Sequence, residues 1–263
     1  MPFVELSGVV FHCEARLAAP GAPTILFSNS LGTDFRTWDA VVAALPERYG
    51  IIRYDNRGHG LTDIAPASTL DIHVGDVIAL LDHFGVEKAV VCGLSVGGTI
   101  AIGTGVAHPD RVAALILCCT GAKISTADDW DRRIAAVREG GIEALREATL
   151  GRWFPPSFHA GEATTLAGIR NMLVRQTAPG YIEICTMLRD ADLREPSRAI
   201  TAPTLAIAGS EDKSCPPALL KETAERIPGA RYVEMAGSGH IPCIDAPDAL
   251  AGHIVDFLDA SGL

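Results

Sequence analysis

The hydrophobic positions of this chain form two alternating patterns. Short apolar runs such as Thr24–Phe27, Ala89–Cys92 and Val112–Cys119 are typical of strands buried on both faces. Segments between them, such as Leu70–Phe84, place apolar residues at helical spacing instead. Strands that alternate with helices predict an α/β fold, a mostly parallel eight-stranded sheet with helices on both faces.

The pattern also predicts where the elements lie. The expected strands are Phe3–Glu5, Val9–Glu14, Thr24–Phe27, Gly50–Tyr54, Ala89–Cys92, Val112–Cys119, Thr204–Ala208 and Arg231–Met235. The expected helices of the same region are Phe35–Leu45, Leu70–Phe84, Gly98–Ala107, Pro217–Arg226 and Ala246–Leu258.

The alternation stops between residues 122 and 198. This segment has no strand-like run and is typical of several short helices, with breaks expected at Pro155-Pro156 and Pro179-Gly180. We therefore expect a core of residues 1–121 and 199–263 with an inserted helical cap of residues 122–198. The cap should cover the carboxyl ends of the strands, where ligands bind in open α/β sheets.

Composition narrows the class of protein. With 263 residues, of which 48% are hydrophobic, the chain can bury one large core. Its formal net charge of −10 argues against nucleic acid or an anionic membrane surface as a partner. Its seven cysteines include no C-x-x-C spacing, so we expect reduced thiols and a cytoplasmic location. Neither a signal peptide nor a membrane span is expected, and the sequence does not indicate an oligomeric state.

One turn carries a chemical signal. The apolar run Ala89–Cys92 breaks at Gly93-Leu94-Ser95-Val96-Gly97, a G-x-S-x-G pentapeptide, and a small-residue helix follows. In this strand–turn–helix setting the motif indicates a nucleophile elbow, which exposes the serine hydroxyl at the start of a helix. A structural turn rich in glycine and serine would give the same letters, so the elbow needs partners elsewhere in the chain.

Two later strands end in suitable partners. Strand Thr204–Ala208 is followed by two acids, Glu211 and Asp212, and strand Arg231–Met235 is followed by His240. The order Ser…Asp/Glu…His places a nucleophile, an orienting carboxylate and a base at one edge of the sheet. Ser95, Asp212 and His240 are therefore the candidate catalytic residues, with Glu211 as the rival acid.

The same chemistry needs donors for an oxyanion. We expect them to be the backbone N–H groups of Val96, which follows the nucleophile, and of Leu31, in the loop after strand Thr24–Phe27. No group of His, Cys and acidic residues has metal-ligand spacing, so neither a metal nor a cofactor is expected.

With these residues assembled, the chain resembles the α/β-hydrolase superfamily along its length, and more narrowly the 3-oxoadipate enol-lactone hydrolases of the β-ketoadipate pathway. The stretches that carry the narrower resemblance are Phe27-Ser28-Asn29-Ser30-Leu31-Gly32-Thr33-Asp34, Arg53-Tyr54-Asp55-Asn56-Arg57-Gly58-His59-Gly60, Ala122-Lys123-Ile124 with Arg133-Ile134-Ala135-Ala136-Val137-Arg138, and Arg152-Trp153-Phe154. The resemblance implies hydrolysis of an enol-lactone that bears a free carboxylate. It also favours Asp212, three residues after Gly209, over Glu211.

The cap is the expected source of specificity. Residues 122–198 contain 11 Lys and Arg against 11 Asp and Glu, which leaves 11 against 21 in the rest of the chain. Arginine suits carboxylate recognition, so an anionic small-molecule ester is the expected partner. Arg133, Trp153 and Lys123 lie in the resembling stretches and are the candidate substrate contacts.

The chain also departs from the enol-lactonase pattern. Val96 stands where methionine is more usual, and Ile241-Pro242-Cys243 replaces more polar residues after the histidine. These residues are expected to flank the pocket, so the departures concern the precise substrate and not the reaction class. Three alternatives of the same fold stay open: a general carboxylesterase or other lactonase, a cofactor-free perhydrolase, and a non-catalytic small-molecule binding protein.

Overall fold

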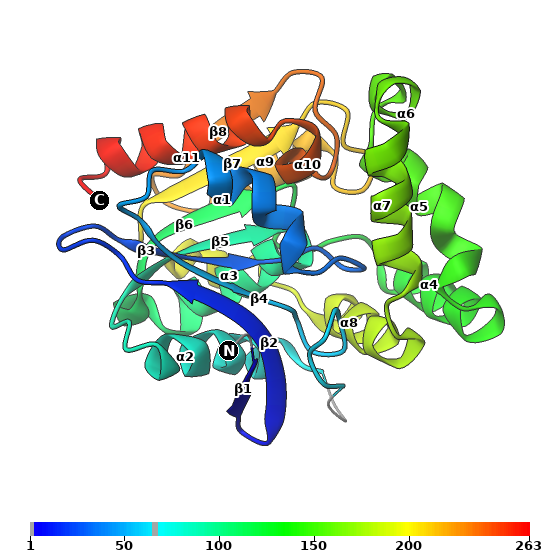
Figure 1. Ribbon diagram of the computed structural model, residues 1–263, viewed down its shortest axis with the longest axis horizontal. Helices are drawn as coiled ribbons and strands as arrows, with labels where there is room; N and C mark the ends of the chain where they lie inside the picture. Colours follow the sequence, from blue (N-terminus) through cyan, green and yellow to red (C-terminus); the bar gives the residue numbers. More distant parts are fainter. Residues whose placement is uncertain (1–2, 65–67) are drawn as a thin grey trace.

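A central eight-stranded sheet organises the protein (Figure 1). The computed structural model describes residues 3–64 and 68–263, so Met1 and Pro2 of the predicted core and residues 65–67 lie outside the described part. The strands run in the order β1-β2-β4-β3-β5-β6-β7-β8; the β1–β2 and β2–β4 pairs are antiparallel and the others are parallel. Their bounds are β1 Phe3–Leu6, β2 Val9–Arg16, β3 Thr24–Ser28, β4 Gly50–Tyr54, β5 Ala89–Leu94, β6 Val112–Cys118, β7 Thr204–Gly209 and β8 Arg231–Met235. The predicted mostly parallel eight-stranded sheet is confirmed.

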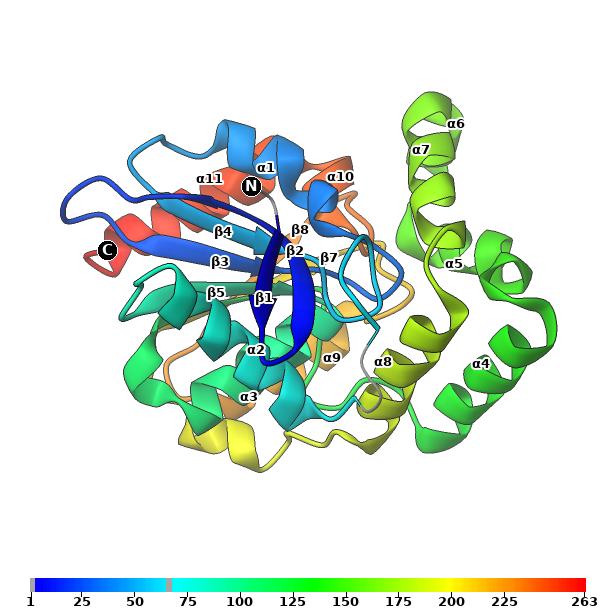
Figure 2. The same ribbon diagram turned by 60° about the horizontal axis from the view of Figure 1, so that its bottom comes forward.

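Helices cover both faces of this sheet. Helices α1 and α11 pack together on one face, and α2, α3 and α9 lie on the other (Figure 2). Strands β3, β5 and β7 are buried along their whole length, which explains their continuous apolar runs. The α-helices are α1 Asp39–Ala44, α2 Leu70–His83, α3 Val96–Ala107, α4 Ala127–Gly140, α5 Arg146–Trp153, α6 Pro156–Gly161, α7 Ala163–Val174, α8 Ala178–Asp190, α9 Pro217–Arg226, α10 Pro242–Asp245 and α11 Pro247–Ala260.

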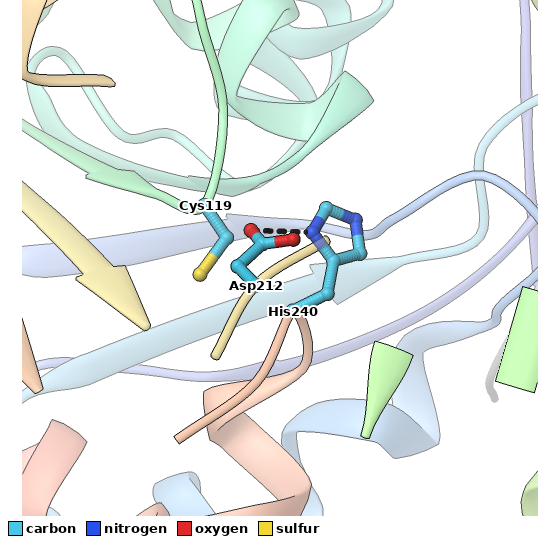
Figure 3. A group of neighbouring side chains, drawn as sticks. All are labelled: Cys119, Asp212 and His240. Atoms are coloured by element: carbon cyan, nitrogen blue, oxygen red, sulfur yellow. Dashed lines mark hydrogen bonds and ion pairs between the residues drawn. The ribbon is translucent and has the colours of Figure 1, made fainter. Parts of the chain in front are cut away.

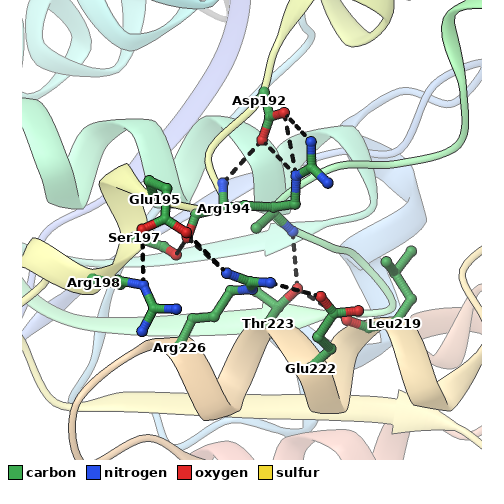
Figure 4. A network of polar contacts seen from close by, with 10 residues as sticks. Asp192, Arg194, Glu195, Ser197, Arg198, Leu219, Glu222, Thr223 and Arg226 are labelled. Carbon is green, nitrogen blue, oxygen red and sulfur yellow. Dashed lines mark hydrogen bonds and ion pairs between the residues drawn. The ribbon is translucent and has the colours of Figure 1, made fainter.

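Five helices, α4–α8, lie between β6 and β7 in the chain and gather at one end of the molecule (Figures 1 and 2). We propose residues 122–198 as a cap because its two connections to the core meet there. The Leu193 amide donates to the Ala122 carbonyl at 2.8 Å, and the Ala122 amide donates to Thr223 Oγ1 on α9 at 2.9 Å. Arg226 of α9 joins the outgoing connection, because it forms an ion pair with Glu195 at 3.3 Å and donates to the Arg194 carbonyl at 3.4 Å (Figure 4).

Several expected element ends differ from the observed ones by one or two residues, and the expected helix Phe35–Leu45 is a 3-10 helix, Phe35–Trp38, followed by α1. Two further differences matter for the site. Helix α3 begins at Val96, directly after the serine, because β5 continues through Leu94 and leaves a single-residue turn. The break expected at Pro179-Gly180 is wrong. Pro179 lies in the first turn of α8, where a missing N–H removes no helical hydrogen bond, and the chain breaks just before Ala178 instead.

All seven cysteines are buried and free. Among the described residues, no helix combines the length and the apolar character that crossing a membrane requires.

Candidate active site

The G-x-S-x-G turn places Ser95 in a strained backbone conformation. Its φ of 56° lies in the left-handed region, which residues with a side chain rarely adopt. Glycine is required on both sides because the chain doubles back tightly. A Cβ on Gly93 would lie 2.1 Å from the Gly97 carbonyl oxygen, and one on Gly97 would lie 2.2 Å from the Ser28 carbonyl oxygen.

Hydrogen bonds from the next strand hold this turn. The Ser95 amide donates to the carbonyl of Cys118, the last residue of β6, at 2.9 Å. Buried Thr120 donates its hydroxyl to the Ser95 carbonyl oxygen at 2.6 Å. The unfavourable φ is therefore fixed by both main-chain groups of Ser95.

Asp212 and His240 form a buried pair at the ends of β7 and β8. Asp212 Oδ2 lies 2.8 Å from His240 Nδ1, and both side chains are almost fully buried (Figure 3). Asp212 Oδ1 accepts from the amides of Ser214 and Cys215 at 2.7 and 2.9 Å. Three hydrogen bonds thus fix the carboxylate, and the one to Nδ1 turns the imidazole so that Nε2 is left for the nucleophile side.

The rival acid lies elsewhere. Glu211 is exposed, and its amide donates to the Ser238 carbonyl at 2.8 Å. A carboxylate that the sequence did not single out, Asp245, supports the histidine loop instead: it accepts from Ser238 Oγ and from the Gly239 amide, both at 2.6 Å. Burial raises the pKa of Asp245 above its ordinary value, and these two hydrogen bonds offset only part of that increase.

Ser95 and His240 line one pocket of about 470 Å³. In the described part of the chain no hydrogen bond joins the two side chains; catalytic hydrogen bonds in ligand-free enzymes are often long and tighten when substrate binds. The thiol of Cys215 lines the same pocket. Burial raises the pKa of this thiol well above 9.0, so it stays protonated beside the serine.

The two expected oxyanion donors flank the serine. Val96 is the first residue of α3, and Leu31 lines the pocket from the loop after β3. Within the residues that the structure describes, neither backbone N–H has a protein acceptor, whereas the Gly97 amide donates to the Asn29 carbonyl at 3.2 Å. The Asn29 bond joins the Leu31 loop to the start of α3, the two segments that carry these N–H groups.

Cationic side chains from the cap and from the Asp212 loop line the pocket. Arg132 pairs with Asp129, the only acid among the lining residues. Arg133, Arg152 and Lys213 have no carboxylate partner in the described part of the chain. Burial lowers the pKa of Arg152, and the positive charge of Arg133 lowers it further. A surplus of positive charge therefore faces the serine in a protein of net charge −10.

The three candidate substrate contacts have different surroundings. Arg133 and Trp153 line the pocket, and the Trp153 carbonyl also accepts from the His240 amide at 2.7 Å. The expectation for Lys123 is wrong, because its Nζ donates to the carbonyls of Arg189 and Ala191 at 2.7 and 2.8 Å and does not line the pocket. Lys123 stabilises the carboxyl end of α8, a common role for lysine at a helix terminus.

Cys119, Asp212 and His240 offer ligand atoms within 4.8 Å of one another (Figure 3). Three ligand atoms this close could hold a metal ion, but the hydrogen bonds that these side chains already make favour a role in hydrolysis instead. The Asp212 oxygens and His240 Nδ1 are already bonded, and the Cys119 thiol donates to the Gly239 carbonyl at 3.6 Å. Burial raises the pKa of Cys119 well above 9.0, which opposes the thiolate that a metal would need. A metal ion would have to disrupt the Asp212–His240 pair.

Comparison with known proteins identifies the family to which the chain is similar. A model of the alpha/beta hydrolase family matches residues 17–253. Two curated relatives from Acinetobacter baylyi are 3-oxoadipate enol-lactonase 1, 40% identical over 73% of this chain and 72% of the relative, and 3-oxoadipate enol-lactonase 2, 34% identical over 89% of this chain and 87% of the relative. The crystal structure of the enol-lactonase from Burkholderia xenovorans LB400 matches with a TM-score of 0.93 and 37% identity, covering 98% of this chain and all of that one.

Proposed function

The chain belongs to the alpha/beta hydrolase family and is a hydrolase of ester bonds, and from this premise we propose that it opens the lactone ring of 3-oxoadipate enol-lactone. The curated relatives named for that activity support the substrate. The observation that carries the proposal is the pocket itself, which Ser95 and His240 line together with Arg133 and Arg152, two arginines without a carboxylate partner among the described residues.

The proposed reaction has two stages. Ser95 Oγ attacks the lactone carbonyl while His240 Nε2 takes its proton, and Asp212 holds the imidazole in the required orientation. The N–H groups of Leu31 and Val96 stabilise the oxyanion. When the ring C–O bond breaks, the enolate oxygen leaves and takes the proton from His240, and the resulting enol tautomerises to a ketone. Water, deprotonated by His240, then hydrolyses the acyl-enzyme and releases the acid.

Charge supports an anionic substrate over a neutral one. The enol-lactone carries one free carboxylate, and an arginine binds such a group through two parallel N–H···O bonds. Arg133 lines the pocket with Trp130, Trp153 and Leu188, so apolar walls surround the cationic end. In such surroundings a charge-assisted hydrogen bond is stronger than in water.

Two substrates test the proposal. We expect purified protein to hydrolyse the enol-lactone with a higher kcat/KM than p-nitrophenyl acetate, and we expect Ser95→Ala to abolish both activities. Ser261→Ala, in the turn after α11, is the matched control and should keep both. A serine-directed phosphonate should label Ser95. If Ser95→Ala keeps its activity, or if the label is found on another residue, the mechanism is wrong.

The apolar walls of the pocket favour one second candidate, a carboxylesterase of broad specificity. Equal or higher kcat/KM for p-nitrophenyl acetate would favour it over the lactonase. We also propose that the enzyme works in the cytoplasm, since reducing conditions suit its seven free thiols.

A further inference from the structure

The Arg133 guanidinium donates hydrogen bonds to two neutral hydroxyl groups that do not line the pocket. Its Nε donates to the Tyr181 hydroxyl at 2.8 Å, and its terminal nitrogen donates to Thr149 Oγ1 at 3.2 Å. The guanidinium carbon lies 5.6 Å from the centre of the Tyr181 ring. Helices α4, α5 and α8 supply one residue each to this cluster. Of the five N–H donors of the guanidinium, three remain for a ligand.

The neutrality of these acceptors matters. A carboxylate in place of Tyr181 would orient Arg133 but would also cancel its charge, and the pocket would lose its attraction for an anion. Burial is the largest influence on the Tyr181 hydroxyl and raises its pKa, so the group stays a neutral phenol near pH 7. Tyr181 and Thr149 thus fix the direction of the guanidinium and leave its full charge to the substrate.

Tyr181 also contacts the loop that carries a proposed oxyanion donor. A Cβ on Gly32, the residue after Leu31, would lie 3.3 Å from Tyr181 Cε2. On another side the ring stacks on His59 of the core, at 6.3 Å between centroids. Tyr181 is fully buried and does not line the pocket, so it cannot touch the substrate. It connects the position of Arg133 to the position of the reacting carbonyl.

We propose that Tyr181 is a positioning residue that determines the preference for carboxylate-bearing esters, because it holds the Arg133 guanidinium at a fixed place relative to the Leu31 loop. The inference rests on the proposed function in two respects, that Ser95 cleaves esters in this pocket and that Arg133 binds a carboxylate of the ester. It does not require that the natural substrate be the enol-lactone.

The test compares two p-nitrophenyl esters of similar length, mono-p-nitrophenyl glutarate with a free carboxylate and p-nitrophenyl valerate without one. For Tyr181→Phe, which keeps the ring and removes the acceptor, we expect kcat/KM for the glutarate ester to fall about tenfold, mostly through KM, as for the loss of a hydrogen bond to a charged group. Kinetics with the valerate ester should stay within about twofold. Thr149→Val should act in the same direction with a smaller effect, since its hydrogen bond is longer.

Two controls separate positioning from a general structural role. Tyr49→Phe removes a similar hydrogen bond, 2.8 Å from Arg48 to the Tyr49 hydroxyl, at a place outside the pocket, and should leave the ratio of the two kcat/KM values unchanged. In an Arg133→Gln background, Tyr181→Phe should have no further effect on that ratio.

Each possible failure has a distinct reading. Equal losses on both esters in Tyr181→Phe, or an undiminished effect in the Arg133→Gln background, would overturn the proposal for Tyr181. If Tyr181→Phe does not fold, the Thr149→Val variant decides. An unchanged ratio of kcat/KM for the glutarate and valerate esters in that variant would also overturn the proposal. Failure of the wild type to hydrolyse the enol-lactone, with both p-nitrophenyl esters still cleaved, would overturn the proposed substrate and leave the role of Tyr181 standing.

Discussion

Two buried histidines predict that mild acid destabilises this protein. His59 and His73 lie in the loop after β4 and in α2, with 1% and 0% of their surface exposed. Burial is the main cause that lowers their pKa values from 6.5 to about 4 for His59 and about 3 for His73. For His73 the positive charge of Arg57 lowers the pKa further.

The direction in which pH changes the free energy of unfolding follows from how many protons each state binds. Both folded-state pKa values lie below the unfolded value, so between pH 6.5 and about 4 the unfolded chain binds protons that the folded chain does not. Stability therefore rises with pH in this window and is lost as the pH falls. From pH 7 to pH 5 each histidine removes about 2 kcal/mol from the free energy of unfolding, or about 4 kcal/mol together.

Buried carboxyl groups act in the opposite direction. Burial raises the pKa values of Asp55, Asp76 and Asp245, so these groups take up protons in the folded state sooner than in the unfolded state. Their protonation favours the fold as the pH falls, and the wild-type loss is smaller than the sum for the histidines. The difference between wild type and a histidine variant isolates the histidine contribution.

The assay is urea unfolding at a series of pH values from 5 to 7. His59→Gln and His73→Gln should each flatten the slope of unfolding free energy against pH by about 1.4 kcal/mol per pH unit in the middle of the window, the equivalent of one proton. His83→Gln, on the exposed side of α2, is the control, because that imidazole contacts water in both states. Slopes for His59→Gln and His73→Gln equal to the wild-type slope would refute the reasoning.

Three changes in the core give further tests. Asp212→Asn should lower kcat about 10⁴-fold through loss of the correct His240 tautomer, and a stopped-flow assay that finds less than a tenfold loss would contradict this role. Thr120→Val removes the bond to the Ser95 carbonyl and should lower stability by about 1 kcal/mol in urea unfolding, with a lower kcat; unchanged values would show that the turn holds without it. Gly97→Ala forces a Cβ to 2.2 Å from a β3 carbonyl and should lower Tm sharply; a wild-type Tm would contradict the proposed tight turn.

The sheet was predictable because its evidence is local. Strand β5 is a nearly continuous apolar run, and Gly93 near its end and Gly97 in the helix that follows mark a turn that only glycine permits. Asp212 and His240 each follow a strand, and parallel strands bring their carboxyl ends to one edge. Their proximity therefore follows from topology without knowledge of any side-chain contact.

The cap was only partly predictable because its contacts are long-range. Tyr181 meets Arg133 across 48 residues, and nothing in the spacing of either helix indicates that these two faces meet. Lys123 failed as a substrate contact for the same reason, since the carbonyls that bind its Nζ belong to the far end of the cap. Arg152 also lines the pocket, and its place beside the expected contact Trp153 could have identified it. The sequence alone, however, does not show whether an arginine lies on the side of a helix that faces a pocket or on the side that faces water.

Core and cap also differ in how their sites affect stability. Both oxygens of Asp212 and Nδ1 of His240 have hydrogen-bond partners within the protein, so this pair does not destabilise the protein when no ligand is bound. Arg152 instead lies half-buried beside the like charge of Arg133, without a carboxylate partner among the described residues, and burial and that charge both lower its pKa, so its charged form destabilises the fold. An entering anion offsets that cost, and a neutral ligand does not. Under the proposed function, the charge of the pocket selects among substrates, whereas Ser95, Asp212 and His240 carry out the reaction that all these substrates share.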